Sequence, residues 1–423
     1  MLVFIRPLDT QFYRSGLPFD AGENDEAVSF FPPYPRTLYG AFRARGILAS
    51  GGDFNNYNGG KYYGDDNGFG SFELKGPIYC RKRKESQEHG SDEIILPIPL
   101  DVVKVKDNSN LIHLIPLQGT NDHLGWDLGN SLPMLLDQMN VEEPLGGPEL
   151  KSLMGEYLLP FNTLGRNYLV NNDLTYCNVS YLLKEESVFC TEDRIGIARD
   201  VTTGTVIEGR LYRAPHIRMN DKVTALHEEY GLLVKLDNYD EASFPEHGLI
   251  QLGGESRAAH YSNLSNDETS YWWEKYEEEI KQKIAETGQF KAYFITPAIF
   301  QKGSLPDVCG TNPYIEISHD GETFRFKLLS LCSAKPKMIA GWDIKKKRPK
   351  PMRLAIPEGS VYFFRYEGSV DKGWESIDEE KRKKVAGKVY DAYNFETWCS
   401  REPWDDEFGP GKEGFGITLI GGW

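Results

Sequence analysis

The feature that most constrains the fold is an order of strand and helix patterns that occurs twice along the chain. Strands are expected where apolar residues alternate or β-branched residues concentrate, and helices where apolar residues recur every three to four positions. In the first copy these are a strand at 1–8, a helix from Pro35, strands at 72–81 and 94–106, a short helix at 149–159 and two strands around 194–218.

The second copy has a similar order, with three strands between its helices and one strand after them. Its elements are a strand at 232–236, a helix at 269–285, strands at 291–296, 324–332 and 360–366, a helix at 376–390 and a strand at 415–420. Single cores rarely exceed about 250–300 residues. The 423 residues therefore predict an α+β chain of two ferredoxin-like (RRM-like) domains, 1–220 and 221–423, with long loop insertions and a C-terminal glycine-rich loop.

Two helices carry informative side-chain patterns. Residues 30–35, Phe-Phe-Pro-Pro-Tyr-Pro, cannot be helical until Pro35, which suits the first helical position. In the helix that follows, Arg36, Tyr39 and Arg43 share one face, which predicts either a solvated basic face or an RNA contact. In the 269–285 helix one stripe is expected to face the core, and its members are Trp273, Tyr276, Ile280 and Ile284.

Composition excludes several classes of protein. The chain has 48 Lys and Arg against 63 Asp and Glu, a net charge of −15, which argues against non-specific coating of nucleic acid. The six cysteines form no CxxC pair and the eight histidines no HxH or HExxH pair, so we expect neither a metal nor a cofactor. No signal peptide or long apolar span is visible, which predicts a soluble, cytoplasmic protein.

The sharpest charge feature is the segment 335–353, with eight Lys and Arg and one Asp. Its local net charge is +7, and subtracting this from −15 leaves −22 for the rest of the chain. Interleaved prolines predict an extended loop or a hairpin. Lys337, Lys345 and Lys346 would follow an RNA backbone, and Trp342 would stack on a base. The alternative is a solvated loop, or a clamp on an acidic partner protein.

Further signals come from arginines and glycines. A second basic cluster consists of Arg194, Arg199, Arg210, Arg213 and Arg218, whose guanidinium groups can bind phosphates in a bidentate manner. Glycines crowd the tight turn at 253–257 and the last 15 residues, where Gly414 and Gly416 lie. Glycine-rich turns let a backbone approach a ligand closely, although ordinary turns share this composition.

Several of these segments, in order along the chain, form a known pattern. They are Phe12–Phe19, Phe31–Arg43, Arg194–Arg199, Gly253–Arg257, Ile295–Phe300, Gly341–Asp343 and Gly414–Gly416. Together they resemble the third subunit of the Cmr module of type III-B CRISPR effector complexes. The Gly- and Asn-rich segment 51–70 and Tyr34 depart from the family pattern.

The resemblance implies a RAMP-superfamily protein that is not itself a nuclease. Family members grip the repeat-derived 5′ handle of the CRISPR RNA, pack against the large polymerase-type subunit and adjoin a backbone subunit, so target RNA would be contacted only indirectly. With the basic clusters added, the expected RNA-binding residues are Arg14, Arg36, Arg43, Arg194, Arg199, Arg257, Lys337, Trp342, Lys345, Lys346, Gly414 and Gly416.

Two alternatives remain open from the sequence. The chain could be a RAMP-family endoribonuclease, in which His216 or His260 acts as the general base on a 2′-hydroxyl. It could also be a purely protein-bridging subunit, in which the basic segment binds an acidic neighbour. A structural histidine is the more common role for each histidine, because neither has a paired carboxylate or a second histidine beside it in the sequence.

Overall fold

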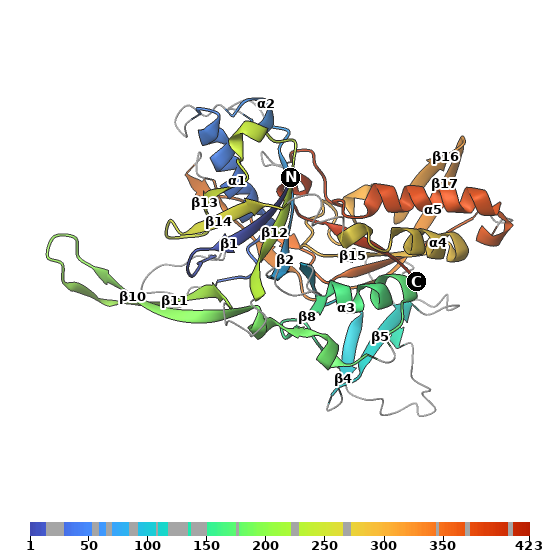
Figure 1. The fold of residues 1–423 in the computed structure, drawn as a ribbon, viewed down its shortest axis with the longest axis horizontal. Helices are drawn as coiled ribbons and strands as arrows, with labels where there is room; N and C mark the ends of the chain where they lie inside the picture. The colour runs from blue at the N-terminus through green and yellow to red at the C-terminus, as the bar shows by residue number, and fades with distance from the viewer. Residues whose placement is uncertain are drawn as a thin grey trace.

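The computed structural model describes residues 1–13, 29–52, 59–64, 70–83, 92–106, 109–116, 134–136, 150–174, 177–220, 228–264, 272–343, 347–368, 373–404 and 409–423. Within these residues the chain is a mixed α+β structure in which the strand pairings are antiparallel. The expected α+β class is therefore confirmed. Figure 1 shows two lobes, with a long two-stranded arm that projects away from both.

The first lobe is built on an eight-stranded sheet. In spatial order its strands are β13 (His247–Gln251), β14 (Ala258–Asn263), β1 (Leu2–Pro7), β12 (Glu228–Asp237), β2 (Glu73–Arg83), β3 (Glu93–Pro97), β8 (Tyr157–Pro160) and β9 (Leu183–Lys184). Strands from both sides of residue 221 share this sheet, and the domain boundary placed there stays a prediction.

The first sheet is buried on both faces, which explains the unbroken apolar run at its central strand β1. Side chains alternate across a strand, so Leu2 and Phe4 point into a core shared with the C-terminal half of the chain. Val3 and Ile5 point the other way, into a second core beneath helix α1 (Pro35–Ala49). Pro35 occupies the first turn of α1, as predicted.

The second lobe has a five-stranded sheet covered by two helices. The strand order is β16 (Tyr314–His319), β17 (Glu322–Cys332), β22 (Val361–Tyr366), β15 (Gln289–Phe294) and β23 (Thr418–Gly422). Helices α4 (Glu277–Thr287) and α5 (Glu379–Tyr393) lie side by side over this lobe (Figure 1). The predicted Trp/Tyr/Ile stripe is confirmed as core, with Ile280 and Ile284 essentially fully buried.

One sequence prediction is wrong in the first half of the chain. No helix spans 149–159; β7 (Leu150–Ser152) and β8 lie there, and helix α3 (Phe161–Arg166) begins only after Pro160. Strand β8 completes the edge of β3, and this pairing outweighs local helix preference. The strands predicted around 194–218 are present as β10 (Phe189–Arg199) and β11 (Val206–Met219). They pair with each other to form the arm, and Ile217 of β11 also forms a bridge with Gln11.

The remaining elements are small. A four-stranded sheet has the order β6 (Met134–Leu136), β5 (Leu111–Pro116), β4 (Val102–Val105) and β7, and α2 (Gly60–Tyr63) and α6 (Pro410–Glu413) are single turns. Two strand pairs, β18 (Lys337–Ile339) with β21 (Arg353–Ala355) and β19 (Trp342–Asp343) with β20 (Arg348–Pro349), make the hairpin predicted for the basic segment. In the described part of the chain, no helix is long and apolar enough to cross a membrane.

Candidate nucleic-acid interface

The arm β10–β11 leaves an apolar and basic surface open to solvent. Alternate residues of β10 face outward, and the side chains of Ile195 and Ile197 are 72% and 41% exposed. Arg199 is also exposed, and no described carboxylate pairs with it. The tip is closed by Asp200, whose carboxylate accepts hydrogen bonds from the backbone of Thr202 and Thr203.

Three arginines converge at the root of the arm on one carboxylate. The guanidinium groups of Arg194, Arg218 and Arg257 lie 3.9, 3.2 and 3.1 Å from the Asp9 carboxylate. A backbone hydrogen bond from Thr10 and these three arginines lower the pKa of Asp9. Arg194 and Arg218 also bind Glu192. The root is therefore a cross-linked ionic network that joins the arm to the end of β1.

The turn at 253–257 fixes the third arginine of this network. Gly253 has a φ of +81°, and a Cβ there would meet the Phe12 carbonyl oxygen at 2.9 Å, so glycine is required. The Gly254 amide donates to the same oxygen over 2.7 Å. Glu255 and Ser256 follow in the left-handed region and bring Arg257 back toward Asp9.

The two histidines considered as bases have different surroundings. The side chain of His216 is 2% exposed, and its Nε2 lies 3.6 Å from a Glu255 carboxylate oxygen, a pairing that the sequence did not reveal. Burial lowers the pKa of His216, and Arg194 and Arg257 act in the same direction. His260 is half-buried and stacks on His247.

Arg36 lies at a junction between the two lobes, not on a solvated face. Its Nε donates to Glu413 Oε2 over 2.8 Å, and Lys350 Nζ lies 3.5 Å from the other Glu413 oxygen. Arg36 and Glu413 are 8% and 1% exposed. The prediction of a solvated basic face on α1 is therefore wrong, because the C-terminal segment covers that face.

Arg43, Gly414 and Gly416 belong to the same region. Arg43 Nε donates to the Tyr63 carbonyl over 2.8 Å, and burial lowers the pKa of Arg43. Gly414 has a φ of +100° and packs against β2, where a Cβ would meet the Gly76 carbonyl oxygen at 2.7 Å. A Cβ on Gly416 would meet the sulfur of Cys399 at 2.5 Å. Both glycines are buried and allow close packing of protein segments.

The basic hairpin at 337–355 borders this junction. A Cβ built on Gly341 would lie 3.2 Å from the Arg36 side chain. Lys337 pairs with Glu358, whereas Trp342 is 59% exposed. Arg14, Lys345 and Lys346, which were also predicted to bind RNA, lie outside the described residues.

The predicted residues thus fall into two groups. Arg194 and Arg257 meet at the arm root, with Arg199 further along the arm. Arg36, Gly414 and the basic hairpin meet at the junction. Sequence reasoning missed Asp9 and Glu413, which organise the two groups. Each could have been found as an acidic residue beside a motif. Asp9 lies just before the Phe12–Phe19 motif, and Glu413 lies directly before Gly414.

The described residues contain no group of three His, Cys, Asp or Glu side chains that could hold a metal ion.

Comparisons with known proteins identify the family. This chain is similar to two chains of known structure. Each alignment covers 92% of this chain and 93% of the other, with a TM-score of 0.42, and the sequence identities are 16% and 15%. The two chains of known structure come from type III-B Cmr-beta bound to cognate target RNA, in one case with AMPPnP as well. No curated protein matches the sequence. A family model described as "CRISPR-associated protein (Cas_Cmr3)" matches residues 3–398, so this chain belongs to the Cas_Cmr3 family, as its ordered motifs indicated.

Proposed function

We propose that this chain is a non-catalytic subunit of a type III-B CRISPR effector complex in antiviral defence. It binds the 5′ handle of the CRISPR RNA and docks the large polymerase-type subunit onto the backbone subunit, so that it meets target RNA only indirectly. The observation that carries the RNA-binding role is the arm, because its exposed Ile195, Ile197 and Arg199 stand on a rigid ionic root.

The arm has the chemistry that single-stranded RNA binding requires. Exposed β-branched side chains offer apolar contact to unstacked bases, and Arg199 offers a charge to the phosphates. The three arginines of the root are neutralised by Asp9, Glu192 and Glu255, so they position the arm instead of supplying free charge. RNA contact is therefore assigned to the arm beyond its root.

The strand connections support two ferredoxin-like domains. In the first lobe α1 connects β1 to β2, and β12 lies between these two strands in the sheet. In the second lobe α5 connects β22 to β23, and β15 lies between them. Each arrangement is a split βαβ unit, the characteristic half of a ferredoxin-like domain. The segment 409–416 would then be the glycine-rich loop of the family.

The burial of His216 supports a non-catalytic role. A general base must come within hydrogen-bonding reach of the 2′-hydroxyl it deprotonates, and a side chain that is 2% exposed has no such access. Incubation of the purified protein with repeat RNA in EDTA tests this point. We expect intact RNA; defined cleavage that disappears in His216→Ala or in His260→Ala would instead favour the endoribonuclease.

Charge reversal on the arm tests the RNA-binding role. In complexes reconstituted with CRISPR RNA, Arg199→Glu should lower RNA retention and reduce the salt dependence of binding by about one phosphate contact. Arg325→Glu, an exposed arginine on β17, makes the same charge change outside the arm and should leave both quantities unaltered. Equal RNA content and salt dependence in the two variants would contradict the proposal.

Ultraviolet crosslinking separates RNA binding from pure protein bridging. We expect crosslinked peptides of this chain from β10 or β11 in the assembled complex. Crosslinks confined to other subunits would favour the bridging role.

A further inference from the structure

The basic hairpin at 337–355 presents an exposed apolar face that the functions above do not use. Met338 and Leu354 are direct cross-strand partners of β18 and β21, and they are 48% and 66% exposed. Their neighbours Ile339 and Ala355 point the other way and are fully buried. Trp342 and Met352 extend the exposed face at 59% and 49%. One side of the hairpin is thus packed onto the protein, and the other side is an apolar strip in solvent.

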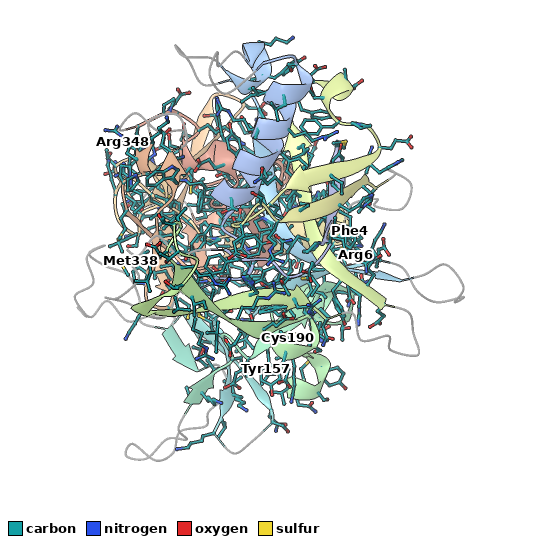
Figure 2. All side chains as sticks on the ribbon, turned by 90° about the vertical axis from the view of Figure 1, so that its left-hand side faces the viewer. Phe4, Arg6, Tyr157, Cys190, Met338 and Arg348 are labelled. Carbon is teal, nitrogen blue, oxygen red and sulfur yellow. The ribbon has the colours of Figure 1, made fainter. Side chains whose placement is uncertain are left out.

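Several cations of this hairpin are already engaged within the chain. Lys337 pairs with Glu358, Lys350 approaches Glu413, and the Arg353 guanidinium lies 4.6 Å from the centre of the Trp404 ring. Lys335, Lys347 and Arg348 are exposed and have no ion pair with any described residue. Figure 2 shows Met338 and Arg348 at the same edge of the molecule. The cations without a described ion pair and the exposed apolar residues therefore belong to the same basic segment.

This arrangement fits a protein partner better than an RNA strand. An RNA site that follows the phosphate backbone needs unpaired cations along its length. In the basic segment 335–353 only Lys335, Lys347 and Arg348, among the described cations, are exposed without a described ion pair. Protein interfaces, by contrast, have apolar centres enriched in aromatic residues, Met and Arg, with a polar border.

We propose that the exposed face of the 337–355 hairpin docks a folded protein partner whose apolar depression is bordered by carboxylates. Charge complementarity selects this partner, because the exposed Lys335, Lys347 and Arg348 favour acidic surfaces and disfavour basic ones. Trp342 and the Met338–Leu354 pair are its central anchors. The inference deepens the docking role proposed above, and it moves Lys337 and Trp342 from the RNA-binding set to a protein-binding set.

Direct binding measurements with the full-length chain test this assignment. The probes are the purified large subunit, the purified backbone subunit and a mixed-sequence single-stranded RNA, each measured separately. The variants are Met338→Asp with Leu354→Asp, and Trp342→Ala. Leu249→Asp is the matched control, because Leu249 is 54% exposed on the edge strand β13. Circular dichroism and sedimentation velocity report on folding and self-association.

We expect one of the two proteins to bind at least about tenfold more weakly to both variants, with binding to the control unchanged. The double variant Lys347→Glu with Arg348→Glu should slow association with the same protein at low salt. In all of these hairpin variants the affinity for the single-stranded RNA should change less than about twofold, because the arm is unaltered.

Three outcomes would overturn the proposal: RNA affinity falls while both proteins bind normally, only self-association is lost, or no binding changes. If the hairpin variants lose binding to a protein while Arg199→Glu leaves RNA binding unchanged, the docking surface is supported and the RNA-binding role of the arm is refuted. The two proposals therefore fail separately.

Discussion

Arg36 and Arg199 come from the same sequence argument, yet they have opposite surroundings. Arg36 lies between the two lobes, 8% exposed, and donates to Glu413. Arg199 lies on the outer part of the arm, exposed, and no described carboxylate pairs with it. Both are motif arginines that were predicted to bind RNA. The contrast shows that a motif arginine either holds the fold together or remains available to a ligand.

The difference follows from what covers each residue. The C-terminal segment 409–416 crosses α1 and β2, and it desolvates Arg36 together with its carboxylate partner. In the arm β10 pairs with β11, and the bridge to Gln11 is made by Ile217 of β11, so β10 keeps an outward face. Motif residues at the junction should therefore affect stability, and motif residues on the arm should affect binding.

The largest expected effect is at the junction. Arg36→Met removes the ion-pair partner 2.8 Å from the buried Glu413 carboxylate, and we expect a loss of about 3–5 kcal/mol in the free energy of unfolding, as for other broken buried ion pairs. Arg166→Met removes an exposed pair with Glu279 and should cost much less stability than Arg36→Met. Urea unfolding of both variants measures these free energies. Equal losses of stability would contradict the view that the ion pair at the junction holds the fold together more than an exposed ion pair does.

The second expected effect is at Gly414. Gly414→Ala combines a strained φ of +100° with contact to the Gly76 carbonyl, and about 2–4 kcal/mol of stability should be lost. Gly303→Ala is the control, because it has a φ of +65° with no atom within 4 Å of the new Cβ, and should cost about 1 kcal/mol. Thermal unfolding distinguishes them. A mild Gly414→Ala variant would mean that the junction tolerates movement.

A third effect extends the comparison to a buried lysine. Lys291 Nζ donates to Asn172 Oδ1 over 2.6 Å and lies 3.6 Å above the Tyr168 ring, and burial lowers its pKa to about 7. Between that value and the ordinary 10.5, the unfolded chain binds more protons than the folded chain. This lysine therefore makes stability rise with pH, by at most about 1.4 kcal/mol per pH unit.

The pH effect is measured as a difference in slope. Lys291→Met should remove this contribution between pH 7 and 9 when unfolding free energies are compared with the unmodified chain. Lys388→Met, at an exposed position on α5, should leave the slope unaltered. Parallel slopes for the Lys291 variant and the unmodified chain would show that Lys291 remains charged in its buried position.

The smallest effect on stability is expected on the arm. Arg199→Glu and Ile195→Asp replace exposed side chains and should change the free energy of unfolding by less than about 0.5 kcal/mol, although both should weaken RNA retention. Chemical denaturation alongside RNA measurements provides the check. Marked destabilisation by either variant would place the arm with the junction as a structural element.

The parts of the fold that depend on nearby residues were predictable. Pro35 and the apolar spacing after it predicted α1, and the Trp/Tyr/Ile stripe predicted the buried face of the α4 region. Most strands lie close to their expected positions, because alternation and β-branched residues are local signals. The prolines of 335–353 predicted an extended loop or a hairpin, and the strand pairs β18–β21 and β19–β20 show a hairpin.

The parts that depend on distant partners were not predictable. Nothing near Arg36 indicates Glu413, which is 377 positions away, and nothing near Asp9 indicates that three arginines meet there. The helix expected at 149–159 is absent because β3 supplies a pairing edge. His216 was unpredictable for the same reason, because its carboxylate neighbour Glu255 comes from the distant turn at 253–257.

The crossing of the first sheet by segment 409–416 has a consequence for synthesis. A ribosome makes α1 and β2 more than 300 residues before it makes Glu413 and Gly414. Until that segment emerges, the guanidinium of Arg36 lacks its carboxylate partner and the backbone around Gly76 lacks its cover. The contacts around Arg36 therefore form only near the end of translation, and a nascent chain halted before residue 409 would contain α1 and β2 without the segment that covers them.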